Sequence, residues 1–543
     1  MDRMRAIISL GVLLGTLGAA RADEHDRAPL FNNLGTHHHP VTTRSKEAQR
    51  YFDQGLTLVY GFNHHEAIRS FRAAARLDPD CAMAYWGAAL AYGMNINMPM
   101  MEDAVPKAYE ALQKALELAP KASEKERAYI QALAKRYTAK PEKDRGPLDR
   151  AYADAMRELA RRYPDDLDAA TLFAEAVMDT MPWNYWTEDG KPRAGTEEVI
   201  TVLESVLKRD PNHPGANHYY IHAVENSPNP EGGLPAAYRL GGLCPGAGHL
   251  VHMPSHIFLR VGYYREAAVA NERAIAADEA YIAQCKAQGV YPANYYSHNA
   301  HFLWYVTMLE GRGEEALRAG RKAAAVPTAK DLQEMPHLHW LRPVPLLTLA
   351  RFGRWDELLR EPQPAADAPY EIAMWHYARG LAYVRQRKTE QAAGQLEALQ
   401  AVAASKEAQA MEIPFFPGHS LIRLAEAILA AELAGLRGNA EEQLRGLEEA
   451  VRRQDKLPYM EPPYWYYPVR QSLGAALLQG GQVAKAEAVY REDLKRHPNN
   501  GWSLYGLLQC LRRQGRTEEA ADVERRFREA WSGADVALTA SCF

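Results

Sequence analysis

Cysteine, strong net charge and long apolar runs are what this sequence has little of. Five cysteines occur in 543 residues, none of them in a Cys-x-x-Cys pair, which disfavours a disulfide scaffold or a thiolate zinc site. The 64 Lys and Arg residues nearly balance the 68 Asp and Glu residues, so no nucleic-acid partner is expected. After residue 22, no apolar run reaches the roughly 18 residues that a membrane-spanning helix needs.

Familiar catalytic motifs are also missing. The sequence has no Gly-x-Ser-x-Gly elbow, no Walker loop, no Gly-x-Gly-x-x-Gly after a strand and no His-Glu-x-x-His. Its 47% of hydrophobic and 24% of charged residues are ordinary for a globular protein. The 19 histidines are unevenly spread, so we expect any chemistry to lie where they gather.

The N-terminus has the pattern of a secretory signal. Arg3 and Arg5 precede an apolar stretch from Ile7 to Leu17, and a small-residue cleavage site ends at Ala22. We therefore expect cleavage after this alanine. The chain is predicted to be an exported bacterial protein, periplasmic or secreted, with no transmembrane segment.

Small and large residues recur along the chain in a fixed order. Between Tyr51 and Pro79, glycines, alanines and aromatic residues follow one another as in two closely packed helices closed by a proline turn. The run from Gly481 to Pro498 is followed by Gly515, which begins the same order 34 residues later. This pattern resembles the tetratricopeptide repeat (TPR), a helix pair with a period of about 34 residues.

The resemblance implies an all-α solenoid, a right-handed superhelix of about twelve helix pairs in one continuous domain. It also implies a concave groove, lined by the first helix of each pair, in which a partner binds. The expected division is a signal peptide at 1–22, an N-terminal extension at 23–47, the TPR solenoid at 48–534, a tail at 535–543, and loop-forming insertions near 95–106, 180–196 and 280–293.

Seven histidines lie within 84 residues of the chain. They are His218, His222, His249, His252, His256, His298 and His301. Repeat landmarks place them in register without using the histidines themselves, because Pro211 and Pro245 are 34 residues apart. The same shift superimposes the first two histidines on His252 and His256.

A second shift, of 49 residues from Gly262 to Gly311, superimposes His249 and His252 on the last two histidines. Spacings of three, four and seven residues place histidines on one helix face. Pro254 interrupts this pattern: the helix either kinks there, or begins there with the two preceding histidines on a loop. We expect all seven imidazoles to converge on one transition-metal site in the groove.

Neutral imidazoles bind copper, zinc, iron and nickel. Copper is favoured, because three histidines per ion suit a pair of copper ions that handles oxygen; zinc and iron are the alternatives. Soft donors also favour copper, and the sequence offers Met94, Met98, Met100, Met101 and Met253. We predict that Glu225 or Glu175 takes the proton of a metal-bound water.

Aromatic residues near the histidines are predicted to bind the substrate. They are Trp183, Trp186, Tyr219 and Tyr295. The two tryptophans belong to the insertion at 180–196, which we expect to cover the site and limit its access to solvent.

Three functions stay open at this stage. The first is a metalloprotein, a copper-dependent oxidoreductase or a metal-dependent hydrolase, with a small-molecule or peptide ligand in the groove. The second is a scaffold for an envelope protein or peptide, which is the usual role of the family. The third is metal storage or delivery. Histidines in place of the Asn, Lys and Arg of a peptide clamp argue against an ordinary scaffold.

Overall fold

The computed structural model describes residues 28–287 and 289–543, which are predominantly helical. The expected signal peptide lies outside these residues. The chain divides into two compact units. The first holds the chain up to Pro228 together with Gly242–Leu250 and Ala283–Lys286, and the second holds Asn229–Gly241, Val251–Ile282 and Ala287–Phe543. The expected extents of the extension, the solenoid and the tail are not tested by this division and stay predictions.

Most helices of the first unit form antiparallel pairs in chain order. They are α2 (Lys46–Tyr60), α3 (His64–Leu77), α4 (Ala82–Ala91), α5 (Ala104–Leu118), the 3₁₀ helix η1 (Ala119–Lys121), α6 (Glu124–Leu133), α7 (Gly146–Arg162), α8 (Leu167–Met178), α9 (Thr196–Arg209) and α10 (Pro214–Val224). Each packs on its neighbour, and α10 also contacts α2 and α8.

The chain then forms η2 (Pro230–Gly233), α11 (Leu234–Leu243), α12 (Gly248–His252), α13 (Pro254–Val261) and α14 (Tyr264–Cys285). The remaining elements are the π-helix η3 (Tyr291–Tyr296), α15 (Ser297–Leu309), α16 (Gly313–Ala325), α17 (Ala329–Glu334), η4 (Pro336–Leu341), α18 (Val344–Arg351), α19 (Trp355–Leu358), α20 (Pro369–Arg385), α21 (Thr389–Ala403), α22 (Lys406–Gln409), the paired strands β1 (Glu412–Ile413) and β2 (Phe416–Pro417), α23 (Gly418–Leu436), α24 (Ala440–Asp455), α25 (Arg470–Gln479), α26 (Val483–Arg496), α27 (Gly501–Arg513) and α28 (Thr517–Ala530).

Close packing in the first unit depends on glycines that face an aromatic ring. The ring of Phe71 on α3 lies between Gly55 on α2 and Gly87 on α4. A Cβ atom at either glycine would come within 2.7 Å and 2.4 Å of the ring, respectively. Such distances are well inside van der Waals contact, so only glycine permits this approach. The small residues of the repeat pattern are therefore the points where helices cross.

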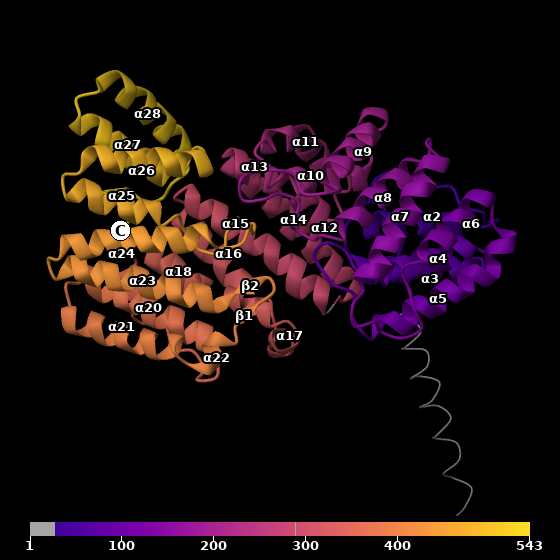
Figure 1. Ribbon diagram of the computed structural model, residues 1–543, viewed down its shortest axis with the longest axis horizontal. Coiled ribbons are helices and arrows are strands. Elements are labelled where there is room, and N and C mark those ends of the chain that lie inside the picture. The colour runs from indigo at the N-terminus through magenta and orange to yellow at the C-terminus, as the bar shows by residue number, and fades with distance from the viewer. Residues whose placement is uncertain (1–27, 288) are drawn as a thin grey trace, which may run out of the picture. The chain divides into compact units, whose positions relative to one another are not determined.

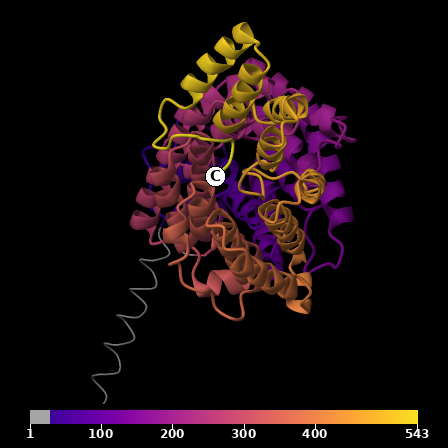
Figure 2. The ribbon, with the colours of Figure 1, turned by 90° about the vertical axis from the view of Figure 1, so that its left-hand side faces the viewer.

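The second unit repeats this arrangement near its end. Tyr490 on α26 lies between Gly474 on α25 and Gly506 on α27, where an added Cβ would come within 2.5 Å and 2.2 Å of the ring. Figure 1 shows helices α23 to α28, in orange and yellow, stacked in chain order. The same order from orange to yellow can be followed in Figure 2, which is turned by 90°. The prediction of an all-α fold is confirmed.

Turn glycines mark the ends of repeat helices, as the sequence pattern predicts. Gly262 and Gly311 have φ angles of 77° and 72°, in the left-handed region where a side chain is disfavoured. An added Cβ at Gly262 would also lie 2.1 Å from the carbonyl oxygen of Pro498. Among the described residues, no helix combines the length and apolar character that crossing a membrane requires.

Candidate metal centres

Three of the seven histidines meet inside the first unit. His218 and His222 lie one turn apart on α10, and His249 lies on α12. All three are at most 2% exposed, and one nitrogen from each lies within 4.8 Å of the other two. We call this set group one. Repeated packing of α10 on α2, α8 and α9 holds the first two histidines rigidly.

Hydrogen bonds orient two rings of group one. Nδ1 of His218 lies 2.6 Å from the carbonyl oxygen of Tyr60, and Nδ1 of His222 lies 2.9 Å from a carboxylate oxygen of Glu225. Because these oxygens accept hydrogen bonds, each Nδ1 carries the proton and each Nε2 keeps its lone pair. This arrangement is typical of metal-binding histidines, whose other ring nitrogen donates to an oxygen.

Three further histidines meet inside the second unit, and we call them group two. They are His252 on α12, His256 on α13 and His298 on α15, again with nitrogens within 4.8 Å of one another. The first two are buried and the third is half-buried. The helix breaks between α12 and α13, where Met253 keeps helical angles of −51° and −35° before Pro254. Both buried histidines are therefore helical, which agrees with a kink and not with a loop.

The proton positions in group two follow the same logic. Nδ1 of His252 donates to the amide oxygen of Asn271 at 2.7 Å, and that amide is oriented by its own 2.8 Å bond to the carbonyl of Ala267. Nδ1 of His256 lies 3.3 Å from Oε2 of Glu461. The Nε2 atoms of the two histidines are 2.9 Å apart and hydrogen-bonded, so with Nδ1 of His252 protonated, Nε2 of His256 donates to Nε2 of His252. A metal ion bound by both Nε2 atoms would replace this proton.

The ring positions also fit one ion in each group. The centroids of group one are 4.8, 4.9 and 6.3 Å apart, so the circle through them has a radius of about 3.2 Å. The centroids of group two are 4.8, 4.7 and 5.9 Å apart, which gives a radius of about 3.0 Å. An ion about 2.0–2.1 Å from an imidazole nitrogen lies about 3.2 Å from that ring's centroid. The centre of each circle can therefore hold an ion.

His301 lies outside both groups. Its ring centroid is 4.9 Å from Trp304 and 4.7 Å from Trp340, and burial lowers its pKa to about 3. The structure thus brings together six of the seven predicted ligands, in two sets of three. His301 packs against the rings of these two tryptophans.

The two predicted proton acceptors occupy different environments. Glu225 is 1% exposed and holds the Nδ1 proton of His222. Glu175 on α8 lies instead in a buried network with Asp179, which is paired at 2.5 Å with Arg136. Burial and the charge of Asp179 raise the pKa of Glu175 well above its ordinary value, and burial raises the pKa of Asp179 to about 6.

The predicted substrate-binding aromatics are divided as well. The ring of Trp183 lies 5.2 Å from that of His222, and the ring of Tyr219 lies 5.2 Å from that of His218. Trp186 donates its indole proton to the carbonyl of Ala223 at 2.8 Å. Tyr295 lies in η3, where its ring packs on that of Tyr291 at 5.3 Å. Whether the 180–196 loop limits solvent access to group one stays a prediction.

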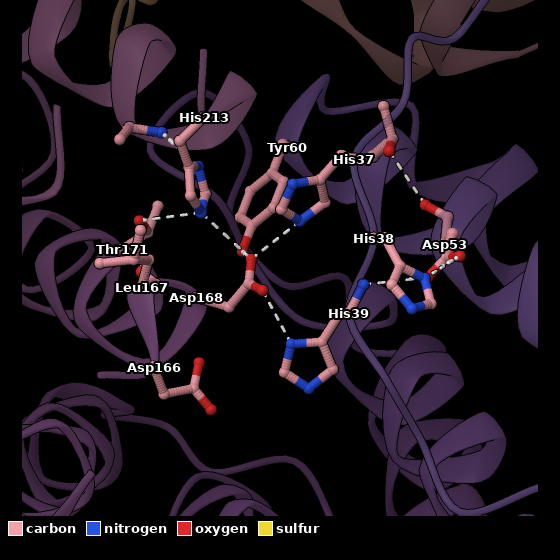
Figure 3. Close-up of polar contacts among 12 residues, drawn as sticks. His37, His38, His39, Asp53, Tyr60, Asp166, Leu167, Asp168, Thr171 and His213 are labelled. Carbon is pink, nitrogen blue, oxygen red and sulfur yellow. Dashed lines mark hydrogen bonds and ion pairs between the residues drawn. The ribbon is translucent and has the colours of Figure 1, made fainter. Parts of the chain in front are cut away.

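A second histidine-rich region gathers around one carboxylate of the first unit (Figure 3). We call it the Asp168 cluster; its members are His37, His39, Tyr60, Asp168 and His213. Oδ1 of Asp168 lies 3.0 Å from Nε2 of His37, 3.2 Å from Nε2 of His213 and 2.5 Å from the hydroxyl of Tyr60, and Oδ2 lies 2.7 Å from Nδ1 of His39. The pattern His-His-His at 37–39 was visible in the sequence, but the carboxylate that it meets was not.

His213 of the Asp168 cluster carries its proton on the opposite nitrogen from His218, His222 and His252. Nδ1 of His213 accepts a hydrogen bond from the backbone N–H of Ala216 and so caps α10. Nε2 must then carry the proton, which it donates to the carboxylate of Asp168. A metal ion at that nitrogen would have to displace both the proton and the cap. Several groups of this chain could hold a metal ion by distance, but this one is already saturated with donors.

Charge stabilises the Asp168 cluster. Burial raises the pKa of Asp168, but the charge and hydrogen bonds of the three histidines outweigh it, and the pKa lies well below its ordinary value. Burial lowers the pKa of His37 and His39, yet the same carboxylate raises both above 6.5. The cluster therefore resembles a buried ion pair that fastens the N-terminal segment to α8.

Glu461 lies beside His256 of group two, where nothing in the sequence indicated it. It lies in the irregular segment between α24 and α25, is 2% exposed and accepts a hydrogen bond from Tyr459. It also lines a cavity of about 190 Å³ together with Arg260 and Trp465. The sequence around Glu461 is rich in proline and aromatic residues, a composition that does not by itself assign a role to the carboxylate.

Comparison with known proteins identifies the repeat. A tetratricopeptide-repeat model matches residues 52–123 and 472–535. These segments contain the two glycine-flanked rings described above, Phe71 and Tyr490. The predicted fold class, an all-α protein of tetratricopeptide helix pairs, is thereby confirmed. A comparison with curated proteins found no match.

Three solved structures align over most of the chain with low sequence identities and low TM-scores. The Cut9–Hcn1 hetero-tetramer of the APC/C is 14% identical, with 92% of this chain and 81% of that chain covered and a TM-score of 0.32. A human IFIT1 dimer with PPP-AAAA is 13% identical, with 87% and 94% covered and a TM-score of 0.31. The TPR domain of P58(IPK) is 13% identical, with 83% and 99% covered and a TM-score of 0.22. Nothing about the ligands of this chain follows from them.

Proposed function

We propose that this chain is an exported metalloprotein in which group one and group two each bind one transition-metal ion. The observation that carries the proposal is the placement of protons: the Nδ1 atoms of His218, His222 and His252 face oxygen acceptors at 2.6–2.9 Å, which leaves each Nε2 basic. Neutral imidazole with an oriented second nitrogen is the common metal ligand. The circles through the three imidazole centroids have nearly equal radii in the two groups, which supports one ion per group.

Copper is the ion that we favour, with zinc or iron as alternatives. Both groups supply imidazole alone, and imidazole suits copper and zinc. Manganese and magnesium prefer ligand sets rich in carboxylates. A bound ion would supply redox chemistry or would acidify a bound water. Glu225 keeps the His222 ring in orientation and holds its Nδ1 proton. Trp183 covers one edge of the same ring.

We propose an oxidoreductase or a hydrolase acting on a small molecule or peptide, and metal storage or delivery as the alternative use of the same groups. A second candidate is a scaffold that binds an envelope protein or peptide. The match of residues 52–123 and 472–535 to the tetratricopeptide repeat favours it. Export rests on the signal pattern of residues 1–22.

Metal content of the full chain tests the proposal. Purified protein, refilled with copper, zinc or iron and freed of excess metal, should hold two equivalents by elemental analysis. His222→Ala and His256→Ala should each lose one equivalent, because each removes one of three ligands from a different group. His376→Ala is the matched control, since this histidine is bonded to Gln395, outside both groups, and it should keep two equivalents. Less than one equivalent in the wild type would overturn the proposal and leave the scaffold.

A further inference from the structure

One phenylalanine contacts all three histidines of each group. The ring centroid of Phe62 lies 4.6, 6.2 and 5.3 Å from those of His218, His222 and His249. The ring centroid of Phe302 lies 5.1, 5.2 and 5.8 Å from those of His252, His256 and His298. Both phenylalanines are at most 2% exposed, and each belongs to the same compact unit as its group.

These distances place each phenylalanine over one face of its histidine ring set. From the three distances, the centroid of Phe62 lies about 4.6 Å from the centre of group one, nearly perpendicular to the plane of the three imidazole centroids. The same construction puts the centroid of Phe302 about 4.5 Å from the centre of group two. Two groups built from different helices thus share one arrangement.

A phenylalanine in this position would block a coordination site of an ion at the group's centre. A ligand about 2.1 Å from such an ion on that face would lie about 2.5 Å from the ring centroid, well inside the roughly 3.5 Å of van der Waals contact. The backbone supports the placement of Phe62, whose φ of 55° is rare outside glycine and turns the residue at the end of α2. Strained backbone of this kind persists where the surrounding structure requires it.

We infer that Phe62 and Phe302 determine metal specificity, each by closing one face of a three-histidine group and leaving a single further ligand position on the opposite face. The inference rests on the proposed function, because it concerns ions bound at these groups. Copper and zinc accept three or four ligands, whereas manganese and magnesium are commonly bound by about six. The sites therefore select ions of low coordination number and retain one exchangeable position.

Cobalt(II) is the probe, because its visible absorption is strong in tetrahedral and weak in octahedral coordination. The metal-free full chain, loaded with two equivalents of cobalt, should show the strong bands of four-coordinate ions. Phe62→Ala and Phe302→Ala should each lose about half of this absorbance per chain, and the double variant nearly all of it, as water enters the opened face. Phe62→Leu and Phe302→Leu should keep most of it. Phe352→Ala removes a buried ring elsewhere and should leave the spectrum unchanged.

Failure of this inference differs from failure of the proposed function. A chain that binds no cobalt, copper or zinc refutes both. Two bound cobalt ions with a weak, octahedral spectrum in the wild type, or with equal spectra in wild type and both alanine variants, overturn the role of the phenylalanines and leave the metal sites standing. If the alanine variants do not fold, X-ray absorption on the copper-loaded wild type decides: three or four ligands support the inference, and five or six overturn it.

Discussion

The two three-histidine groups and the Asp168 cluster each gather histidines beside oxygen acceptors, yet His213 of the cluster carries its proton on the other ring nitrogen from the group histidines. In the groups, Nδ1 donates to an oxygen and Nε2 keeps its lone pair, as for His218 and His252. In the Asp168 cluster, Nδ1 of His213 accepts from a backbone N–H, so Nε2 carries a proton that points at the carboxylate. Proximity of histidines and carboxylates alone therefore does not define a metal site; the partner of the second nitrogen does.

The largest expected effect is on the free energy of unfolding, which should depend on the Asp168 cluster. Asp168→Ala leaves three histidines and the Tyr60 hydroxyl without their common acceptor, and we expect a loss of about 3–5 kcal/mol in the free energy of unfolding. The metal content of group two should not change. Asp165→Ala, whose carboxylate is fully exposed beside Arg209, should cost less than about 0.5 kcal/mol. Chemical denaturation of the metal-free protein measures both, and equal losses would contradict a stabilising role of the buried Asp168 cluster.

Substitution of a residue that hydrogen-bonds a predicted metal ligand should change the affinity for the metal ion. Glu225→Ala removes the acceptor of the His222 Nδ1 proton, so the ring loses its orientation and group one should bind its ion about 10–100-fold more weakly. Glu225→Gln keeps an acceptor oxygen and should recover most of the affinity. Glu204→Ala, which removes a partner of Tyr220 on the same unit, serves as the control. Competition with a chromophoric chelator measures the constants, and an unchanged affinity in Glu225→Ala would show that the ring is held by packing alone.

The smallest effect is in pH dependence, where the two regions should respond in opposite directions. The folded-state pKa values of His37 and His39 are raised, so their contribution is complete below about 6.5 and is lost as pH rises through those values. The pKa of Asp168 is lowered, so its contribution is present above about 3.9 and is lost at lower pH. Metal occupancy of the groups should instead fall as pH drops through about 6.5, because protons compete for Nε2.

Melting temperatures test whether charged His39 stabilises the Asp168 cluster. The difference between wild type and His39→Gln, both metal-free, should be larger at pH 5.5 than at pH 8.5. His38→Gln changes a half-exposed histidine bonded to Asp53 and should show little difference at either pH. A difference for His39→Gln that grows toward pH 8.5 would reverse the sign and refute the charge assignment.

Periodicity explains what the sequence could predict. Glycines and aromatics at fixed spacing mark helix crossings such as Gly55 against Phe71, and these predicted the repeat. The 34-residue shift that pairs His218 with His252 predicted one common site for both, whereas the structure places them in different groups of three histidines. Long-range pairings had no such signal, because Asp168 meets His37 and His39 across about 130 residues of chain.

The register argument also had a limit. It made His298 and His301 equivalent to His249 and His252 and so predicted both as ligands, yet the structure places only His298 in group two. His301 is three residues further along and packs between the rings of Trp304 and Trp340. Which of two histidines on one face reaches a neighbour depends on the rotation of the helix, and repeat spacing does not determine that rotation to within one residue.

Long-range ¹H–¹⁵N NMR of the histidine side chains tests the central claim most directly. In metal-free protein labelled with ¹⁵N-histidine and assigned by single variants, His218, His222 and His252 should show the Nδ1–H form, and His213 the Nε2–H form. Addition of zinc should shift the Nε2 signals of group one and group two and leave those of His37, His39 and His213 in place. A shift of the Asp168 cluster signals before those of the two groups would contradict the account.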